Sequence, residues 1–152
     1  MKTNYPRKTD AIISIEKRRE LIKAARKYIG VRWLHVGRDN NGLDCAGLII
    51  AVIQDVFGID IQVYDYSPWP RPAVMRDICN AILRPIRRED MQPGDVALLY
   101  APGLGVVHLG LFTGKTLIHA SNAPGVQKVV ETTIHPNWLL RGAFAVPVYG
   151  GY

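Results

Sequence analysis

The sequence predicts an α+β fold in which N-terminal helices pack on a C-terminal antiparallel β-sheet. Three segments between residues 14 and 83 have helical character, whereas short apolar runs typical of strands fill the chain after Pro93-Gly94-Asp95. Because helices come first and strands afterwards, an antiparallel sheet covered by helices is favoured over alternating β-α units. The chain has 152 residues, of which 48% are hydrophobic, so it can bury its own core. We expect one domain over residues 1–152.

The first expected helix runs from Ile15 to Ile29. Ser14 is a good N-cap residue, and Gly30 supplies a stop. Apolar residues fall on one face of this segment and basic residues on the other. We interpret the basic stripe as a solvated face. Residues 30–43, rich in Gly and Asn, form a structured loop in this prediction.

The second expected helix, Asp44 to Phe57, is closed by Gly58. It is apolar around most of its circumference, which is typical of a buried helix. A proline-rich stretch, residues 67–72, leads to a weaker helix from Ala73 to Leu83. The strands then follow over Val96–Tyr100, Val106–Phe112, Leu117–Ser121, Val126–Thr132 and Ala143–Tyr149.

Composition narrows the function classes. The first ten residues lack the apolar run of a secretory signal, so we expect synthesis in the cytoplasm without Sec export. Residues 48–53, the longest strongly apolar run, are far fewer than the roughly 20 that span a bilayer, so we expect a soluble protein. The net charge of +6 implies an anionic partner, such as a cell-wall polymer, a membrane surface or nucleic acid. Nucleic acid is disfavoured because the basic residues are scattered and no nucleic-acid-binding motif is present.

Cys45 has the position that a catalytic thiol requires. It begins a buried helix directly after Asp44, a good N-cap residue, where free N–H groups and the helix dipole stabilise a thiolate. We therefore expect a lowered pKa for Cys45, and a backbone N–H nearby to stabilise an oxyanion. The alternative is that Cys45 is a small core residue. Neither Cys45 nor Cys79 lies in a disulfide-rich context, so we expect two free thiols.

Two histidines fall on one predicted hairpin. If the hairpin is symmetric about Gly114-Lys115, His119 lies opposite Gly110 and His108 lies opposite Ser121. His108 and His119 then share a face as diagonal neighbours, with Gly110 leaving room for the His119 ring. That arrangement suits a triad in which His108 takes the thiol proton and His119 orients His108.

Other chemistry is less favoured by the pattern. Either histidine alone could be an ordinary hydrogen-bonded sheet residue. A zinc site is disfavoured because no close ligand pair of the Cys-x-x-Cys or His-x-x-x-His kind occurs, and His135 lies on another segment. We expect no metal and no cofactor.

These residues together resemble a known family. Residues 30–38, Asp44-Cys45-Ala46-Gly47, Pro93-Gly94-Asp95, His108-Leu109-Gly110 and residues 118–121 resemble, in order, the NlpC family of papain-like murein peptidases. The resemblance runs from about Arg19 to Pro147. It implies a papain-like fold and hydrolysis of a peptide bond in the peptidoglycan stem. Cys45, His108 and His119 match the family's catalytic cysteine, histidine and third polar residue.

The resemblance also directs attention to substrate contacts. Trp33 stands where many members have tyrosine, and its N–H can donate a hydrogen bond but accepts none, so it either aids the oxyanion or walls the cleft. His35 is either a substrate contact or a surface-loop histidine. Asp44 and Ser121, beside the catalytic residues in sequence or on the same strand, complete the candidate substrate-binding set.

The rivals to a peptidase are of two kinds. The string Trp33 to Arg38 is similar to members encoded among phage tail genes, with tail proteins as partners, so a structural or wall-binding tail component is one alternative. The other keeps thioester chemistry but acts as an acyltransferase or amidase. We expect a peptidoglycan peptide as substrate.

Overall fold

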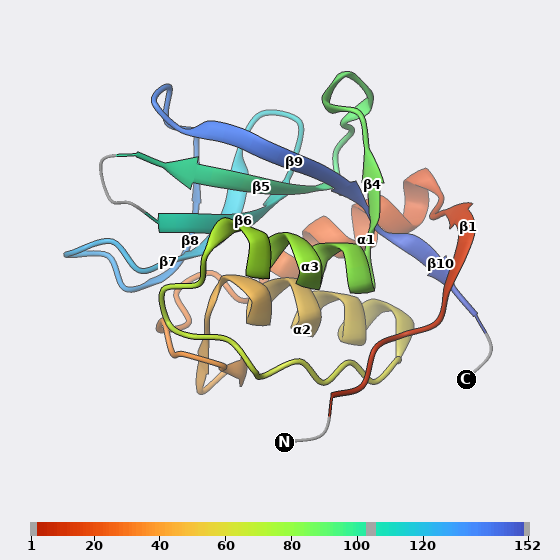
Figure 1. Cartoon of the computed structure of the whole chain (residues 1–152), viewed down its shortest axis with the longest axis horizontal. Helices are drawn as coiled ribbons and strands as arrows, with labels where there is room; N and C mark the ends of the chain where they lie inside the picture. Colours follow the sequence, from red (N-terminus) through yellow and green to blue (C-terminus); the bar gives the residue numbers. More distant parts are fainter. Residues whose placement is uncertain (1–2, 103–105, 151–152) are drawn as a thin grey trace.

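A computed structural model describes residues 3–102 and 106–150 of the chain and confirms the α+β prediction. Its three α-helices are α1 (Ile15–Arg26), α2 (Cys45–Phe57) and α3 (Pro72–Ile82). They pack against a six-stranded antiparallel sheet whose strand order is β4-β9-β5-β6-β7-β8. Figure 1 shows α2 and α3 beneath this sheet. The order of elements is the one that the sequence pattern indicated.

The strands of the main sheet are β4 (Arg84–Ile86), β5 (Val96–Ala101), β6 (Val106–Phe112), β7 (Leu117–Ser121), β8 (Lys128–Thr132) and β9 (Leu139–Ala145). Strands β5 to β8 lie close to the predicted ranges, whereas β9 begins four residues before the predicted Ala143. Two small sheets accompany it. One pairs β1 (Lys8–Ile12) with β10 (Pro147–Tyr149), and the other pairs β2 (Arg38–Asp39) with β3 (Gly42–Leu43). A 3-10 turn, η1, covers Arg88–Asp90.

Several predicted boundaries were wrong. Helix α1 has the expected N-cap, Ser14, but ends at Arg26, before Gly30. The last predicted strand divides into β9 and β10, because the chain leaves the main sheet to pair with β1. Strands β1 and β4 were not predicted. Each depends on a partner far along the chain rather than on its own apolar pattern.

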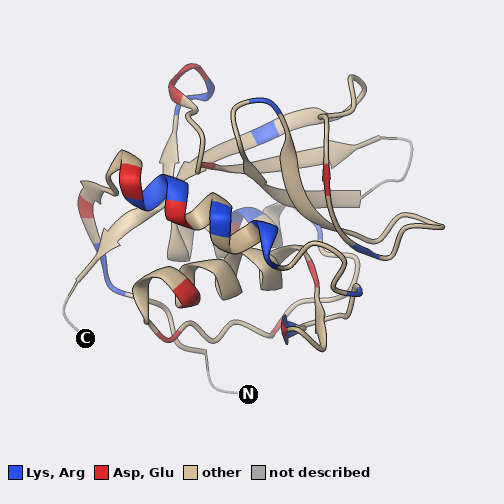
Figure 2. Cartoon of the chain, turned by 180° about the vertical axis from the view of Figure 1, so that it is seen from behind, with Lys and Arg blue, Asp and Glu red and all other residues tan. Residues whose placement is uncertain are grey.

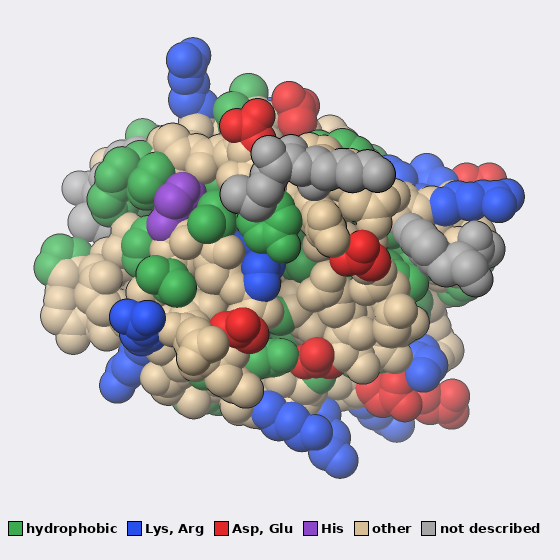
Figure 3. Space-filling model, turned by 90° about the horizontal axis from the view of Figure 1, so that it is seen from below, with side chains coloured by type: hydrophobic (Ala, Val, Ile, Leu, Met, Phe, Trp, Pro, Cys, Tyr) green, Lys and Arg blue, Asp and Glu red, His purple; other side chains and the backbone are tan. Residues whose placement is uncertain are grey.

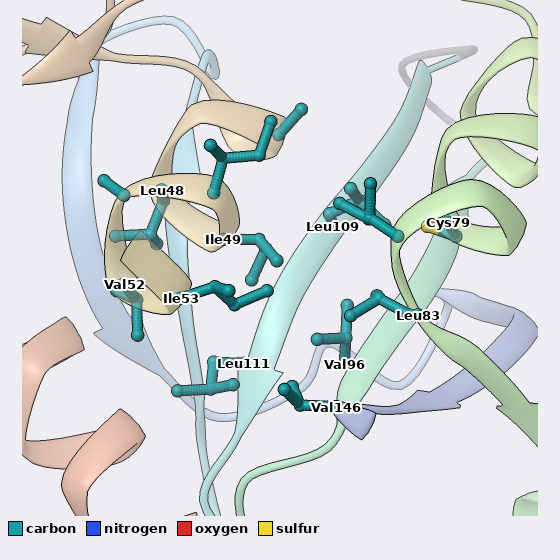
Figure 4. Close-up of a cluster of buried hydrophobic side chains, with 14 of the residues drawn as sticks. Leu48, Ile49, Val52, Ile53, Cys79, Leu83, Val96, Leu109, Leu111 and Val146 are labelled. Atoms are coloured by element: carbon teal, nitrogen blue, oxygen red, sulfur yellow. The ribbon is translucent and has the colours of Figure 1, made fainter. Parts of the chain in front are cut away.

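The core lies between the helices and the sheet. Figure 4 shows Ile49 and Ile53 of α2 facing Leu109 and Leu111 of β6, with Leu48 on the neighbouring side of the helix in the same cluster. All five side chains are at most 2% exposed. Truncating one such leucine to alanine costs about 2–5 kcal/mol of unfolding free energy because a cavity remains. This packing fixes the start of α2 against the middle of the sheet.

The Pro93-Gly94-Asp95 segment, which leads into β5, packs against α1 and so holds this helix beside the sheet. Asp95 is fully buried and accepts a 2.5 Å hydrogen bond from Nη1 of Arg18. Gly94 has φ of +95°, and a Cβ at that position would lie 2.7 Å from Cβ of Arg18. Burying an ion pair requires this close, satisfied geometry. Arg18 is therefore a structural residue, unlike the exposed basic residues of α1 that Figure 2 shows from behind.

Candidate active site

Cys45 is the first residue of α2, as predicted. Asp44 is the N-cap, and its Oδ1 accepts a 2.7 Å hydrogen bond from the N–H of Gly47. A Cβ at position 47 would lie 2.0 Å from the carbonyl oxygen of Gly37. The glycine two residues after the cysteine is thus required because the preceding loop crosses there. The Asp-Cys-x-Gly motif builds the helix start that presents the thiol.

The carboxylate of Asp44 accepts hydrogen bonds from several parts of the chain and is buried, with 3% of the residue exposed. Its Oδ2 accepts from the N–H of Val36 at 2.7 Å and from the hydroxyl of Tyr66 at 2.6 Å. Its Oδ1 accepts from Nη1 of Arg38 at 3.1 Å as well as from Gly47. These bonds occupy most of the carboxylate's acceptor capacity. Asp44 therefore fixes the loop, the helix and Cys45 relative to one another.

The Cys45 thiol lies beside a gap in the hydrogen bonding between strands β6 and β7. Regular pairing of β6 with β7 is confined, in the described chain, to Leu111 with Ile118 and Phe112 with Leu117. Phe112 exchanges backbone hydrogen bonds on the β5 side, so the N–H of Leu109, three residues before it, points toward β7. There this N–H acts on Cys45 instead of on a strand, and it favours the charged form of the thiol. The break in the ladder makes room for the nucleophile.

Burial raises the pKa of Cys45 to about 12, and the negative charge of Asp44 adds to this effect. The backbone N–H groups of Leu109, Ala46 and Cys45 act in the opposite direction, but they do not outweigh desolvation. The expected lowering of the thiol pKa was therefore wrong. The helix start does stabilise a thiolate, yet the apolar surroundings cost the charged form more. At neutral pH the resting nucleophile is a thiol.

His108 and His119 meet as the hairpin register predicted. Nε2 of His108 lies 2.6 Å from Nδ1 of His119, and the two rings cross at 89°. The paired residues Leu111 and Ile118 belong to the predicted register. One detail differs, because a Cβ at Gly110 would lie 2.4–2.6 Å from the side chain of Leu117. The space at Gly110 is thus filled by Leu117 and not by the His119 ring.

Both imidazoles are held neutral. Burial lowers the pKa of His108 to about 3, with a smaller contribution from His119, and burial lowers the pKa of His119 to about 4. Trp138 contributes to the apolar surroundings, since its ring centroid lies 5.8 Å from that of His108 and 5.6 Å from that of His119. With Nε2 of His108 engaged by His119, Nδ1 is the nitrogen left to exchange a proton with the thiol.

A cleft of about 250 Å³ brings most of the predicted residues together. Cys45 and His108 line it, and so do all four candidate substrate contacts, Trp33, His35, Asp44 and Ser121. His119 stands behind His108 and does not line the cleft. Figure 3 shows hydrophobic side chains gathered around a histidine at the left end of the face seen from below. Cys79 is 1% exposed and is not a lining residue, and both cysteines are free.

The candidate substrate contacts differ in how many hydrogen bonds they already make within the protein. Nδ1 of His35 is buried, has no hydrogen-bond partner and lies 3.8 Å from Oδ2 of Asp44. Asp44 is largely committed to structural bonds, as described above. Ser121 is 8% exposed, and its Oγ accepts from the N–H of Ala123 at 3.2 Å. Trp33 is anchored by its backbone N–H, which donates to the carbonyl of Gln127 at 2.8 Å.

Four residues of the site were not predicted from the sequence. Tyr66 and Arg38 hold Asp44, Trp138 packs on both histidines, and Oγ1 of Thr132 lies 2.8 Å from Nε2 of His119. Thr132 alone had a detectable signal, because it ends a predicted strand of the sheet that carries the histidines. Tyr66 and Trp138 come from loops and Arg38 from the two-residue strand β2, and their approach to the site depends on the completed fold.

Comparison with known proteins gives the family. The model of the NlpC/P60 family matches residues 30–141, which is more than half of the chain. The chain belongs to the NlpC/P60 family. The matched segment contains Cys45, His108 and His119. Within the residues that the structure describes, no three His, Cys, Asp or Glu side chains form a group that could hold a metal ion. None of the described helices has the length and hydrophobicity needed to cross a bilayer.

Individual relatives are 15–26% identical to this member of the NlpC/P60 family over the aligned residues. The murein DD-endopeptidase MepS/murein LD-carboxypeptidase of Escherichia coli strain K12 is 25% identical over 113 residues, 74% of this chain and 53% of that protein. The chain thus spans about half the length of the curated relatives it matches. The NlpC/p60 domain of the peptidoglycan hydrolase SagA is 26% identical, with 86% of this chain and 98% of that one covered and a TM-score of 0.58. NlpC2 of Trichomonas vaginalis, 15% identical over 91% of this chain and 50% of that one, shares the fold with a TM-score of 0.64.

Proposed function

We propose that this NlpC/P60 protein is a cysteine endopeptidase that hydrolyses a peptide bond in the stem peptide of peptidoglycan. The observation that carries the proposal is the contact of His108 with His119 at 2.6 Å, behind a cleft that the Cys45 thiol also lines. A nucleophile, a base and a group that orients the base are the parts of a thiol peptidase. The resemblance to a murein endopeptidase and to a peptidoglycan hydrolase supports the choice of substrate.

The acylation step follows from the donors and acceptors. Sγ of Cys45 attacks the carbonyl carbon of the scissile bond while its proton passes to Nδ1 of His108. The carbonyl oxygen becomes an oxyanion, and the backbone N–H of Cys45, at the positive end of α2, stabilises it. His108 then gives the proton to the leaving amine. The C–N bond breaks, and a thioester joins the substrate acyl group to Cys45.

Deacylation reverses these roles. A water molecule attacks the thioester carbon and gives its proton to Nδ1 of His108. The C–S bond breaks, the acid product leaves, and the proton returns to Sγ of Cys45. During both steps His119 accepts a hydrogen bond from Nε2 of His108 and stabilises the imidazolium that forms. No cofactor enters this scheme.

The resting site is a neutral pair in this proposal. The raised pKa of the Cys45 thiol and the lowered pKa of His108 keep the proton on sulfur until substrate arrives. Proton transfer therefore accompanies the attack. The same apolar cleft that disfavours the separated charges strengthens the hydrogen bonds to the oxyanion, since electrostatic interactions grow as water is excluded.

Digestion of purified sacculi tests the proposal. The wild-type protein is expected to release fragments separated at a stem-peptide amide bond, which mass spectrometry identifies, and the Cys45→Ala protein is expected to release none. Cys79→Ala is the matched control and is expected to cleave normally. Binding without cleavage by the wild type would contradict the proposal and favour a structural component. Cleavage between the sugar and the peptide would indicate an amidase, and transfer of the acyl group to an added amine would indicate an acyltransferase.

We also propose that phage tail proteins are partners of this protein. The support is the resemblance of the string Trp33 to Arg38 to members encoded among phage tail genes. Purified tail particles from a producing strain are expected to contain the protein at a fixed ratio to tail subunits. Its absence from such particles would refute this partner.

A further inference from the structure

Thr132 is the last of three side chains, after His108 and His119, that are linked by hydrogen bonds. Its Oγ1 lies 2.8 Å from Nε2 of His119, whose Nδ1 lies 2.6 Å from Nε2 of His108. The register of β7 and β8 produces the contact, because His119 pairs with Val130, and Thr132 is two residues further along the same face. Thr132 is exposed on the edge strand of the sheet, whereas His119 is 3% exposed.

The direction in which the protons are donated along these hydrogen bonds decides whether His108 can act as a base. A neutral imidazole carries one N–H. If His108 is to accept the thiol proton at Nδ1, its own N–H must be Nε2–H, which donates to Nδ1 of His119. The N–H of His119 is then Nε2–H, and it needs an acceptor, which Oγ1 of Thr132 supplies.

If these hydrogen bonds run in the opposite direction, His108 cannot act as the base. If the Thr132 hydroxyl donates to His119, His119 donates from Nδ1 to His108, and the proton of His108 moves to the nitrogen that should receive the thiol proton. Exposure of Thr132 favours the working direction. Its hydroxyl hydrogen can be donated to bulk water while an oxygen lone pair faces His119.

We propose that Thr132 is a positioning residue of this enzyme, whose hydroxyl oxygen holds His119, and through it His108, in the tautomer that catalysis requires. The inference rests on the proposed function for its kinetic consequence, although the tautomer itself is a property of the folded protein. It assigns a role to a fourth residue after Cys45, His108 and His119, one that lies on the sheet and does not line the cleft.

Valine is the decisive substitution. Thr132→Val keeps the shape of the side chain but removes the oxygen that accepts from Nε2–H of His119, so the inactive tautomer gains population. Since an unsatisfied buried donor is costly, we expect kcat to fall about tenfold with KM changed less than about twofold. Thr132→Ser is expected to recover most of the loss. Thr133→Val removes an exposed hydroxyl one residue away and serves as the matched control, with kcat unchanged.

The experiment combines kinetics on a synthetic stem peptide with ¹⁵N NMR of the histidine rings. In the wild type we expect His119 to be the Nε2–H tautomer, and in Thr132→Val we expect the Nδ1–H tautomer to increase. If the wild type does not cleave the peptide, the proposed function fails, but the NMR still decides the role of Thr132. A wild-type His119 protonated at Nδ1 would overturn the inference. An active wild type with Thr132→Val unchanged in kcat and in tautomer would overturn it too.

Discussion

Replacing His119 separates the two roles that this account gives to the histidines. In the wild-type protein Nδ1 of His119 lies 2.6 Å from Nε2 of His108. In His119→Ala the Nε2–H of His108 loses this acceptor. Leaving a donor unsatisfied in a buried site costs about 1–3 kcal/mol. Because 1.36 kcal/mol corresponds to a factor of ten, kcat/KM is expected to fall roughly 5- to 150-fold. His108→Ala removes the base itself and is expected to cost more than about 10³-fold.

The assay is hydrolysis of a soluble stem peptide by each variant, with thermal unfolding as a check on the fold. His119→Asn and His119→Gln are expected to recover part of the loss, because an amide oxygen can accept the hydrogen bond from His108. His135→Ala is the control for a histidine outside the chain, since His135 is exposed on another segment. If His119→Ala keeps wild-type activity, His119 does not orient the base, and the site is a Cys45–His108 dyad.

Three further outcomes follow from charge and burial. Lowering the pH from 6.5 to about 4 should lower the unfolding midpoint, because the unfolded state binds protons at His108 and His119 while the folded state, with their pKa values held at about 3 and 4, does not. His119→Gln should flatten this dependence, and an unchanged slope would contradict the buried neutral pair. Binding to sacculi should weaken steeply as salt rises, whereas cleavage of a small peptide should change far less, because the exposed basic residues of α1 are screened beyond about 8–10 Å at physiological ionic strength. Equal salt sensitivity would remove wall retention as the role of the +6 charge. Iodoacetamide should alkylate Cys45 before Cys79, with peptide mapping as the measurement, because only Cys45 lines the cleft. Faster labelling of Cys79 would contradict the cleft geometry.

Local signals predicted the fold and the position of each proposed catalytic residue. Asp44 and Gly58 bound helix α2 through short-range capping, which a sequence displays directly. The register of the β6–β7 hairpin follows from its short turn, and that register brings His108 to His119. Such features depend on residues a few positions apart, so they can be recognised without knowing the rest of the structure.

Features that depend on distant packing could not be predicted. We predicted a lowered pKa for Cys45, but burial raises it. The helix start can be recognised in the sequence, whereas the degree of burial cannot. The basic residues of the first predicted helix were all interpreted as a solvated face, although one of them, Arg18, pairs with the buried Asp95 across 77 positions. The role of Asp44 likewise changed once Tyr66, 22 residues later, was seen to donate to it. Tertiary contacts decide these properties.

The central claim is that Cys45 forms a thioester with a stem peptide, and trapping that intermediate tests it most directly. The wild-type protein is mixed with the peptide, quenched in acid within the first turnover and analysed by mass spectrometry after proteolysis. The account predicts an added acyl group on the fragment that contains Cys45, released by hydroxylamine and absent from Cys45→Ala. Continued turnover by Cys45→Ala, or an acyl group attached to a different residue, would contradict it.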